Sequence, residues 1–125
     1  MDLSKFTQKS QEAVAEAQAV AIRLGHQQVD ADHLFRALVG QENGLVPRLL
    51  ERAGYDVRAL AAALDQELGK MPRVSGPGAQ PGQIYVTQRM NEVMLAAQDL
   101  AKKMQDEYVS VEHVLLAILE KPGTG

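Results

Sequence analysis

Two short runs of the chain place an acid next to a histidine. Residues 29–34 read VDADHL and residues 109–114 read VSVEHV, and each run leads into an apolar stretch. A carboxylate beside an imidazole can act as an acid–base pair, and both groups are zinc ligands. The two runs are therefore the first candidates for a reactive or metal-binding site.

A zinc site needs three or four ligands held close together. His26, Asp30, Asp32 and His33 could supply some of them near the first run, but the equivalent positions of the second run carry Asp106 for His26 and Ser110 for Asp30. The chain has no Cys, which excludes thiolate ligands, disulfides and cysteine catalysis. No serine stands in a nucleophile motif and no phosphate-binding P-loop occurs, so we predict neither a metal site nor catalysis.

Both runs also have the pattern of a helix start. Asp30 and Ser110 are residue types that cap helix N-termini. Asp32 and Glu112 then fall in the first helical turn, where the positive end of the helix dipole favours an acid. The histidine of each run belongs to the same turn, so this structural interpretation explains the runs without any chemistry.

The runs recur because the chain contains an internal repeat with an offset of 80 residues. Residues 7–44 align with 87–124 without a gap, and nine positions are identical, against about two or three expected by chance. The identical residues of the first copy are Thr7, Gln8, Glu12, Ala17, Gln18, Ala21, Val29, His33 and Ala37. A single helical unit has therefore been duplicated.

Each copy predicts a long helix followed by a short one. Thr7 and Thr87 stand at the N-cap of the long helix, and Gly25 marks its end in the first copy. A stripe at helical spacing in the second copy, which contains Met90, Met94 and Met104, predicts core packing, although exposed methionines also form adaptable binding surfaces. The short helices bury Leu34, Phe35, Leu38 and Val39 in one copy, and Val114, Leu115, Ile118 and Leu119 in the other.

The first copy continues with two more predicted helices, over 44–54 and after Asp56, before a stretch rich in Pro and Gly. We predict one all-α domain over 1–125, in which repeat one spans 1–70, a linker spans 71–85 and a partial repeat two spans 86–125. Since the second copy stops after its short helix, it looks truncated. We therefore expect apolar surface on Leu115 to Leu119 to lack a cover.

Composition narrows the function classes. A net charge of −3 and dispersed basic residues disfavour a nucleic-acid surface. No segment approaches the roughly 20 apolar residues of a membrane span, and the N-terminus lacks the apolar region of a signal peptide. We therefore expect a cytoplasmic protein that contacts neither nucleic acid nor membrane.

The repeat carries a family resemblance. The segments FTQKSQEAVAEAQ, HQQVDADHLFRALV, GQIYVTQRMNEVMLAAQDLA and DEYVSVEHVLLAIL resemble the two repeats of the Clp N-terminal domain of Clp/Hsp100 unfoldases. The connection KMPRVSGPGAQPGQIY is most similar to the ClpB-type disaggregase branch. The resemblance implies an all-α pseudo-two-fold bundle of tandem Clp repeats.

The resemblance also implies a function. The module would be a non-catalytic domain that binds exposed apolar segments of unfolded or aggregated proteins. It would need no cofactor, whereas the parent protein would be a homohexamer that uses ATP and Mg in its ATPase rings. A ClpA/ClpC-type resemblance would imply docking of an adaptor protein instead, and a small metal-dependent enzyme is the third hypothesis.

Six positions match the family's substrate-binding residues: Thr7, Ala96, Leu100, Asp106, Glu112 and His113. The threonine and the two acids would form a polar rim, and the other three would line an apolar groove. Ala96 and His113 stand where larger aliphatic side chains are found in the family, which implies a shallower, more polar groove. Without the resemblance, Thr7 is a helix cap and the acids are solvated.

Overall fold

The computed structural model describes residues 3–72 and 84–120. This part of the chain contains six helices and two short strands. In chain order they are α1 (Gln8–Arg23), β1 (Gln28–Val29), α2 (Ala31–Val39), α3 (Leu45–Arg52), α4 (Val57–Gly69), β2 (Tyr85–Val86), α5 (Gln88–Lys103) and α6 (Val111–Glu120). The prediction of an all-α fold is confirmed.

The long helices α1 and α5 begin in the same way. The Thr7 hydroxyl oxygen accepts from the Ser10 amide at 3.2 Å, and that of Thr87 accepts from the Met90 amide at 3.1 Å. Each cap satisfies an amide that has no partner within the helix. The predicted caps are therefore confirmed, and they set the start of both repeats.

The helices specific to the first repeat also follow the prediction. Pro47 lies in the first turn of α3, where its missing N–H costs nothing, and α3 ends at Arg52, shortly before Gly54. The Asp56 carboxylate caps α4 by accepting from the amides of Arg58 and Ala59. Most of the predicted linker, residues 73–83, lies outside the described residues.

Two strand pairings that the sequence does not predict join the repeats. β1 pairs with β2 in parallel, with Val29 opposite Val86, and an isolated parallel bridge joins Phe6 to Val109. The second pairing is the first with the repeats exchanged, since each residue is shifted by the 80-residue offset. This exchange of partners is what a pseudo-two-fold axis between the repeats produces.

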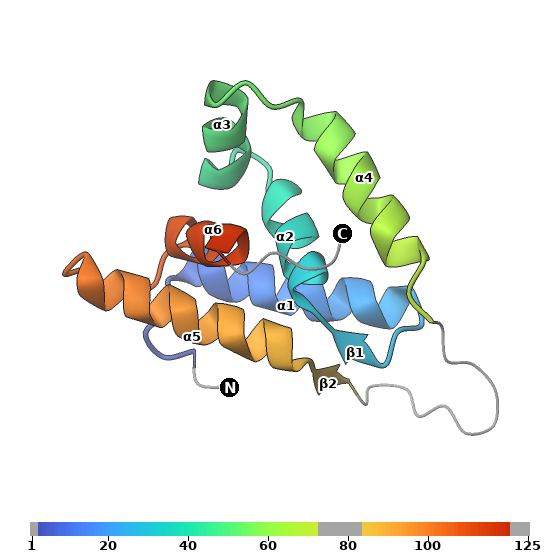
Figure 1. The fold of residues 1–125 in the computed structure, drawn as a ribbon, viewed down its shortest axis with the longest axis horizontal. Coiled ribbons are helices and arrows are strands. Elements are labelled where there is room, and N and C mark those ends of the chain that lie inside the picture. The colour runs from blue at the N-terminus through green and yellow to red at the C-terminus, as the bar shows by residue number, and fades with distance from the viewer. Residues whose placement is uncertain (1–2, 73–83, 121–125) are drawn as a thin grey trace.

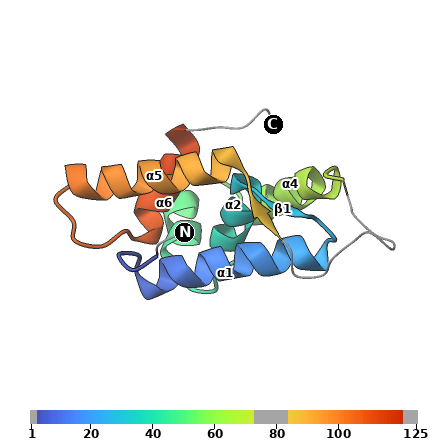
Figure 2. The ribbon, with the colours of Figure 1, turned by 90° about the horizontal axis from the view of Figure 1, so that it is seen from below.

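The helices are arranged about that axis. In Figure 2, α1 and α5 form opposite edges of the molecule, with α2 and α6 between them. The colours of Figure 1 show that α1 and α5 run in opposite directions, while α3 and α4 extend to one side of the bundle. Each long helix packs mainly on the short helix of its own repeat, and α2 also contacts α6.

The core is aliphatic, as the composition requires. Small residues of α1, Ala17 and Ala21, are fully buried and let neighbouring elements approach closely. Met90 and Met94 of α5 are buried at 0% and 2% exposure, which confirms core packing for these two. Met104 follows the last residue of α5 and is 51% exposed, so its assignment to the buried stripe is wrong.

The outer face of α6 is partly uncovered. Leu115 and Ile118 are buried, and α3 packs against this helix, so the expected gap does not extend to them. Leu116 and Leu119 are 43% and 55% exposed. The expectation of burial for Leu119 is therefore wrong, whereas the expectation of exposed apolar surface here is confirmed for these two residues.

Candidate functional site

Three of the six predicted site residues meet where the segment after α5 enters α6. The Asp106 carboxylate lies 2.9 Å from the His113 ring, and the Ser110 hydroxyl donates to the Glu112 carboxylate at 3.0 Å. We call this group, Asp106, Ser110, Glu112 and His113, the second junction. The side chain of His113 is buried, at 1% exposure, whereas that of Asp106 is 47% exposed.

The hydrogen bonds fix the proton position on His113. Its Nδ1 atom accepts from the backbone amide of Ser110 at 2.9 Å, so a neutral ring carries its hydrogen on Nε2. That Nε2–H then donates to Asp106. Because the ring is buried and bonded on both sides, His113 forms an internal support of the junction rather than an exposed wall of a groove.

Thr7 lies next to this junction. Its backbone amide donates to the carbonyl of Val109 at 3.0 Å, and the Ser10 hydroxyl donates to the same carbonyl at 3.0 Å. Val109 directly precedes Ser110, so the start of α1 and the start of α6 are bonded together. The Thr7 hydroxyl donates to the Ser10 hydroxyl at 2.9 Å and accepts from the Ser10 amide at 3.2 Å. The second of these bonds is the helix cap.

The remaining two predicted residues lie on α5. Ala96 and Leu100 are partly buried and pack against the core, four residues apart on one flank of the helix. A cavity of 520 Å³ lies along the opposite flank, where Phe6, Met94 and Leu95 supply most of its apolar lining.

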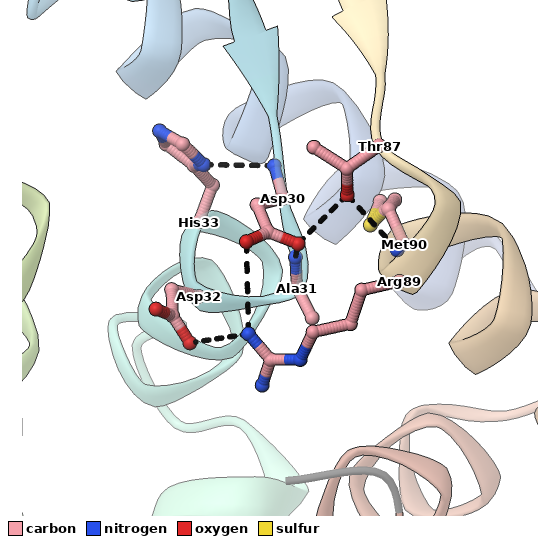
Figure 3. Close-up of polar contacts among 7 residues, drawn as sticks. All are labelled: Asp30, Ala31, Asp32, His33, Thr87, Arg89 and Met90. Atoms are coloured by element: carbon pink, nitrogen blue, oxygen red, sulfur yellow. Dashed lines mark hydrogen bonds and ion pairs between the residues drawn. The ribbon is translucent and has the colours of Figure 1, made fainter. Parts of the chain in front are cut away.

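The first repeat holds an equivalent junction made of His26, Asp30, Asp32 and His33, of which Figure 3 draws the last three. His33 Nδ1 accepts from the Asp30 amide at 2.9 Å, as His113 does from Ser110. Its Nε2 lies 2.9 Å from Nδ1 of His26, which occupies the position of Asp106. The same backbone geometry is thus built twice with different partners for the histidine.

The first junction is bound to the second repeat by two side chains of the α5 start. The Thr87 hydroxyl donates to the Asp30 carboxylate at 2.7 Å. Arg89 bridges two acids, at 3.0 Å from Asp32 and 3.6 Å from Asp30 (Figure 3). A guanidinium has the planar fork of donors that suits such a pair of carboxylates.

The second junction has no such bridge. Lys9 is the equivalent of Arg89, and it pairs with Glu12 at 3.7 Å on the surface of α1. Ser110 replaces the first acid, and among the described residues no basic side chain forms an ion pair with Glu112. Glu112 therefore offers a carboxylate where the first repeat has already bound a guanidinium.

His33 is the group whose protonation the fold disfavours. Burial lowers the pKa of His33, and the neighbouring His26 lowers it further, while Asp30 and Asp32 act in the opposite direction. Burial acts because a charged ring loses its hydration.

In residues 3–72 and 84–120, no group of three or more His, Cys, Asp or Glu residues is placed to hold a metal ion. No described helix is long and apolar enough to cross a membrane.

Sequence reasoning overlooked Arg89, Ser10 and the pairing of each histidine with residue 26 or 106. The repeat offset contained a signal for Arg89, because it aligns with Lys9, but only the fold shows that the two bind different acids. The histidine partners lie seven residues before each histidine, and a turn, which no local periodicity predicts, brings them together.

Comparison with known proteins places this geometry in a family. The sequence model of the Clp repeat (R) N-terminal domain matches residues 5–125. A chaperone protein ClpB of Nitratidesulfovibrio vulgaris is 60% identical over 99% of the chain, and one of Bacillus cereus is 42% identical over 98%. The chain spans 14% of the length of each of these relatives.

Solved structures agree on the fold. The N-terminal domain of Hsp104 from Candida albicans superposes with a TM-score of 0.83 at 23% identity, covering 94% of this chain and 75% of that one. The N-terminal domain of the ClpV1 ATPase from an enteroaggregative E. coli superposes with a TM-score of 0.83 at 22% identity, covering 96% and 71%. At these identities the likeness concerns the fold alone.

Proposed function

Since the chain belongs to the Clp repeat N-terminal domain family, we propose that it is the substrate-binding module of a ClpB-type disaggregase chaperone. Its substrates, here called clients, are exposed apolar segments of unfolded or aggregated proteins. The module itself binds without catalysis and without a cofactor. The parent protein is a cytoplasmic homohexamer whose ATPase rings use ATP and Mg to act on the client.

The observation that carries the proposal is the unneutralised acid of the second junction beside apolar surface. Glu112 forms no ion pair within the described chain, and Leu116, one helical turn later on α6, is 43% exposed. The first repeat shows what such a junction binds, because Arg89 occupies the equivalent place there. A basic side chain of a client therefore binds Glu112 in the second repeat.

Apolar contact supplies the remaining affinity. Ala96 and Leu100 contribute a shallow apolar flank, and burial of such surface is worth about 25 cal/mol per Å². Thr7 and Asp106 complete the polar rim, and Asp106 remains accessible although it accepts from His113. Binding is weak, because an unfolded client pays an ordering cost when it binds. A weak interaction suits a module that passes its client on.

The test is a titration of a fluorescent, unfolded apolar client that carries Arg or Lys. Leu100→Ser and Glu112→Gln each weaken binding by about fivefold, or about 1 kcal/mol. Glu112→Gln leaves unchanged the binding of a matched client in which the basic residues are replaced by Gln. Fluorescence anisotropy at low salt measures both, since an exposed ion pair is screened by salt.

Control variants are available on surfaces away from the junction. Tyr55→Ser, in the turn between α3 and α4 where Tyr55 is 62% exposed, and Glu67→Gln on α4 leave client binding unchanged. Thr7→Ala and Asp106→Ala complete the set after circular dichroism has shown that each is folded. Equal binding by all site and control variants contradicts the proposed site.

An adaptor-docking module, as in ClpA/ClpC-type unfoldases, is the second candidate. The name of one structural neighbour refers to a peptide from the SciI protein of a type VI secretion system. Stoichiometric binding of one folded partner, together with no binding of the unfolded client, would favour the adaptor function and overturn the proposal.

A further inference from the structure

The two junctions differ at the position that faces the histidine. Residue 26 is a histidine, and its equivalent in the second repeat is Asp106. Each lies 2.9 Å from the histidine of its own junction. One buried imidazole therefore faces another imidazole, and the other faces a carboxylate.

In the first junction, the hydrogen bonds determine which ring nitrogens carry a hydrogen and which accept one. His33 Nδ1 accepts from the Asp30 amide, so a neutral ring carries its hydrogen on Nε2 and donates it to His26 Nδ1. A proton added to either Nδ1 atom would point at an N–H that is already there. His33 is 0% and His26 5% exposed, so water cannot readily replace the lost bond.

The second junction pairs its histidine with a carboxylate. The Nε2–H of His113 donates to Asp106, and a hydrogen bond to an ionised acceptor is stronger than one to a neutral ring nitrogen. The Ser110 hydroxyl oxygen lies 3.0 Å from Nδ1, and its own hydrogen goes to Glu112. In the first junction the equivalent residue, Asp30, instead accepts from Thr87.

The charged groups around the first junction do not offset its resistance to protonation. Asp30 and Asp32 of α2 favour a charged His33, but Arg89 of α5 bridges both acids. The N-terminus of α2, where His33 lies in the first turn, also disfavours a positive charge. Tyr85 of β2 lines the 260 Å³ cavity next to His26.

We propose that the first junction holds the two repeats together at neutral pH and weakens in acid. This acid sensitivity arises because residue 26 is a histidine. Protonation of the histidine pair removes the acceptor of the Asp30 amide. Asp30 is also the residue whose carboxylate holds Thr87 and lies near Arg89, so the contact between repeats weakens with it. In the second junction a carboxylate, Asp106, stands at the equivalent position.

The direction of the pH effect follows from the difference in the pKa of His33 between the folded and the unfolded chain. The folded chain holds His33 neutral, with its pKa lowered, whereas the unfolded chain takes up a proton near pH 6.5. Stability is therefore complete above about pH 6.5 and is lost as the pH falls towards the lower pKa of the folded state.

The test replaces His26, the hydrogen-bond partner of His33. Urea unfolding of the whole chain at pH 7.5 and pH 5.5 is compared with that of His26→Asp, which copies the second junction. The unfolding equilibrium constant of the unsubstituted chain rises by about tenfold over this range, because below about pH 6.5 the unfolded chain takes up one proton that the folded chain does not. That of His26→Asp rises by less than about threefold, because its carboxylate stabilises a charged His33.

A second measurement reads the hydrogen-bond chain directly. Imidazole ¹⁵N spectra at pH 7.5 show His33 with its hydrogen on Nε2 and an unprotonated Nδ1. If His26→Asp does not fold, His26→Asn supplies a neutral oxygen acceptor, and its rise lies between the other two. An equal pH dependence of the unsubstituted and variant chains, or a hydrogen on Nδ1 of His33, overturns the proposal. Client binding plays no part in either measurement, so this result is independent of the proposed function.

Discussion

Arg89 and Lys9 occupy the same repeat position but have different roles. Arg89 reaches across to Asp30 and Asp32 of the first repeat, and its side chain is only 23% exposed. Lys9 pairs with Glu12 on its own helix, with its side chain 65% exposed. The sequence alone suggests a surface cation at this position in both copies, but only Arg89 of the second copy links the two repeats.

The difference predicts unequal costs for the same substitution. Arg89→Met destabilises the chain by about 1–2 kcal/mol, because a partly buried carboxylate loses a charge-assisted partner. Lys9→Met changes stability by less than about 0.5 kcal/mol, since exposed pairs contribute little. Urea unfolding at pH 7.5 measures both. Equal effects would mean that the Arg89 bridge does not hold the repeats together.

The residue patterns predicted the caps Thr7, Asp30, Asp56 and Thr87. They also predicted the placement of Asp32 and Glu112 in the first turns of their helices. They did not predict that His33 and His113 would be almost fully buried. A histidine in a first turn can face solvent or the interior with equal propensity. The partner that makes burial tolerable, His26 or Asp106, comes from a different element.

At the scale of elements, each long helix is followed by a turn that directs the chain towards the junction of the same repeat. Gly25 has a φ of 75° and its equivalent, Gln105, has a φ of 60°, so both residues are left-handed. In each repeat the next residue is the histidine partner, and its amide bonds back to the helix, at Ala21 for His26 and Ala101 for Asp106. The left-handed residue thus places the partner within reach of its histidine.

Substitutions at the two turns have different expected effects. Gly25→Ala costs about 1–2 kcal/mol, because a Cβ atom disfavours the left-handed conformation. Gln105→Gly changes stability by less than about 0.5 kcal/mol, since the relieved strain is offset by the greater chain entropy of the unfolded glycine. Thermal unfolding followed by circular dichroism checks both. Tolerance of Gly25→Ala would show that this turn adapts.

Helix boundaries were the best-predicted feature at this scale. Gly25, Gly54 and Asp56 marked helix ends or starts correctly, because capping and left-handed turns depend on residues close in sequence. The two-residue strands β1 and β2 were missed, since neither shows any periodicity and each forms only against the other.

At the scale of the molecule, the repeats are interlocked rather than stacked. The segment before α1 pairs with the segment before α6, and the segment before α5 pairs with the segment before α2. Phe6 and Val109, at one of these pairings, are each 3% exposed. Each repeat therefore completes its core with residues of the other.

Interlocking predicts that neither repeat folds alone. A fragment of residues 1–72 has a weak helical signal and unfolds without cooperativity, because it lacks the partners of Phe6 and Val29. Mixing it with residues 84–125 restores the helical signal and a cooperative transition, which circular dichroism measures. Cooperative folding of the first fragment alone would contradict this description.

The sequence by itself determined the repeat, its offset, the helices and their caps, because these depend on periodicity and on contacts within a few residues. The tertiary structure decided which side chains meet across the pseudo-two-fold axis: Arg89 with two acids, each histidine with its partner, and Glu112 with no cation in the described chain. The physical reason is that both copies obey the same local rules, whereas the surroundings of each copy are set by the other.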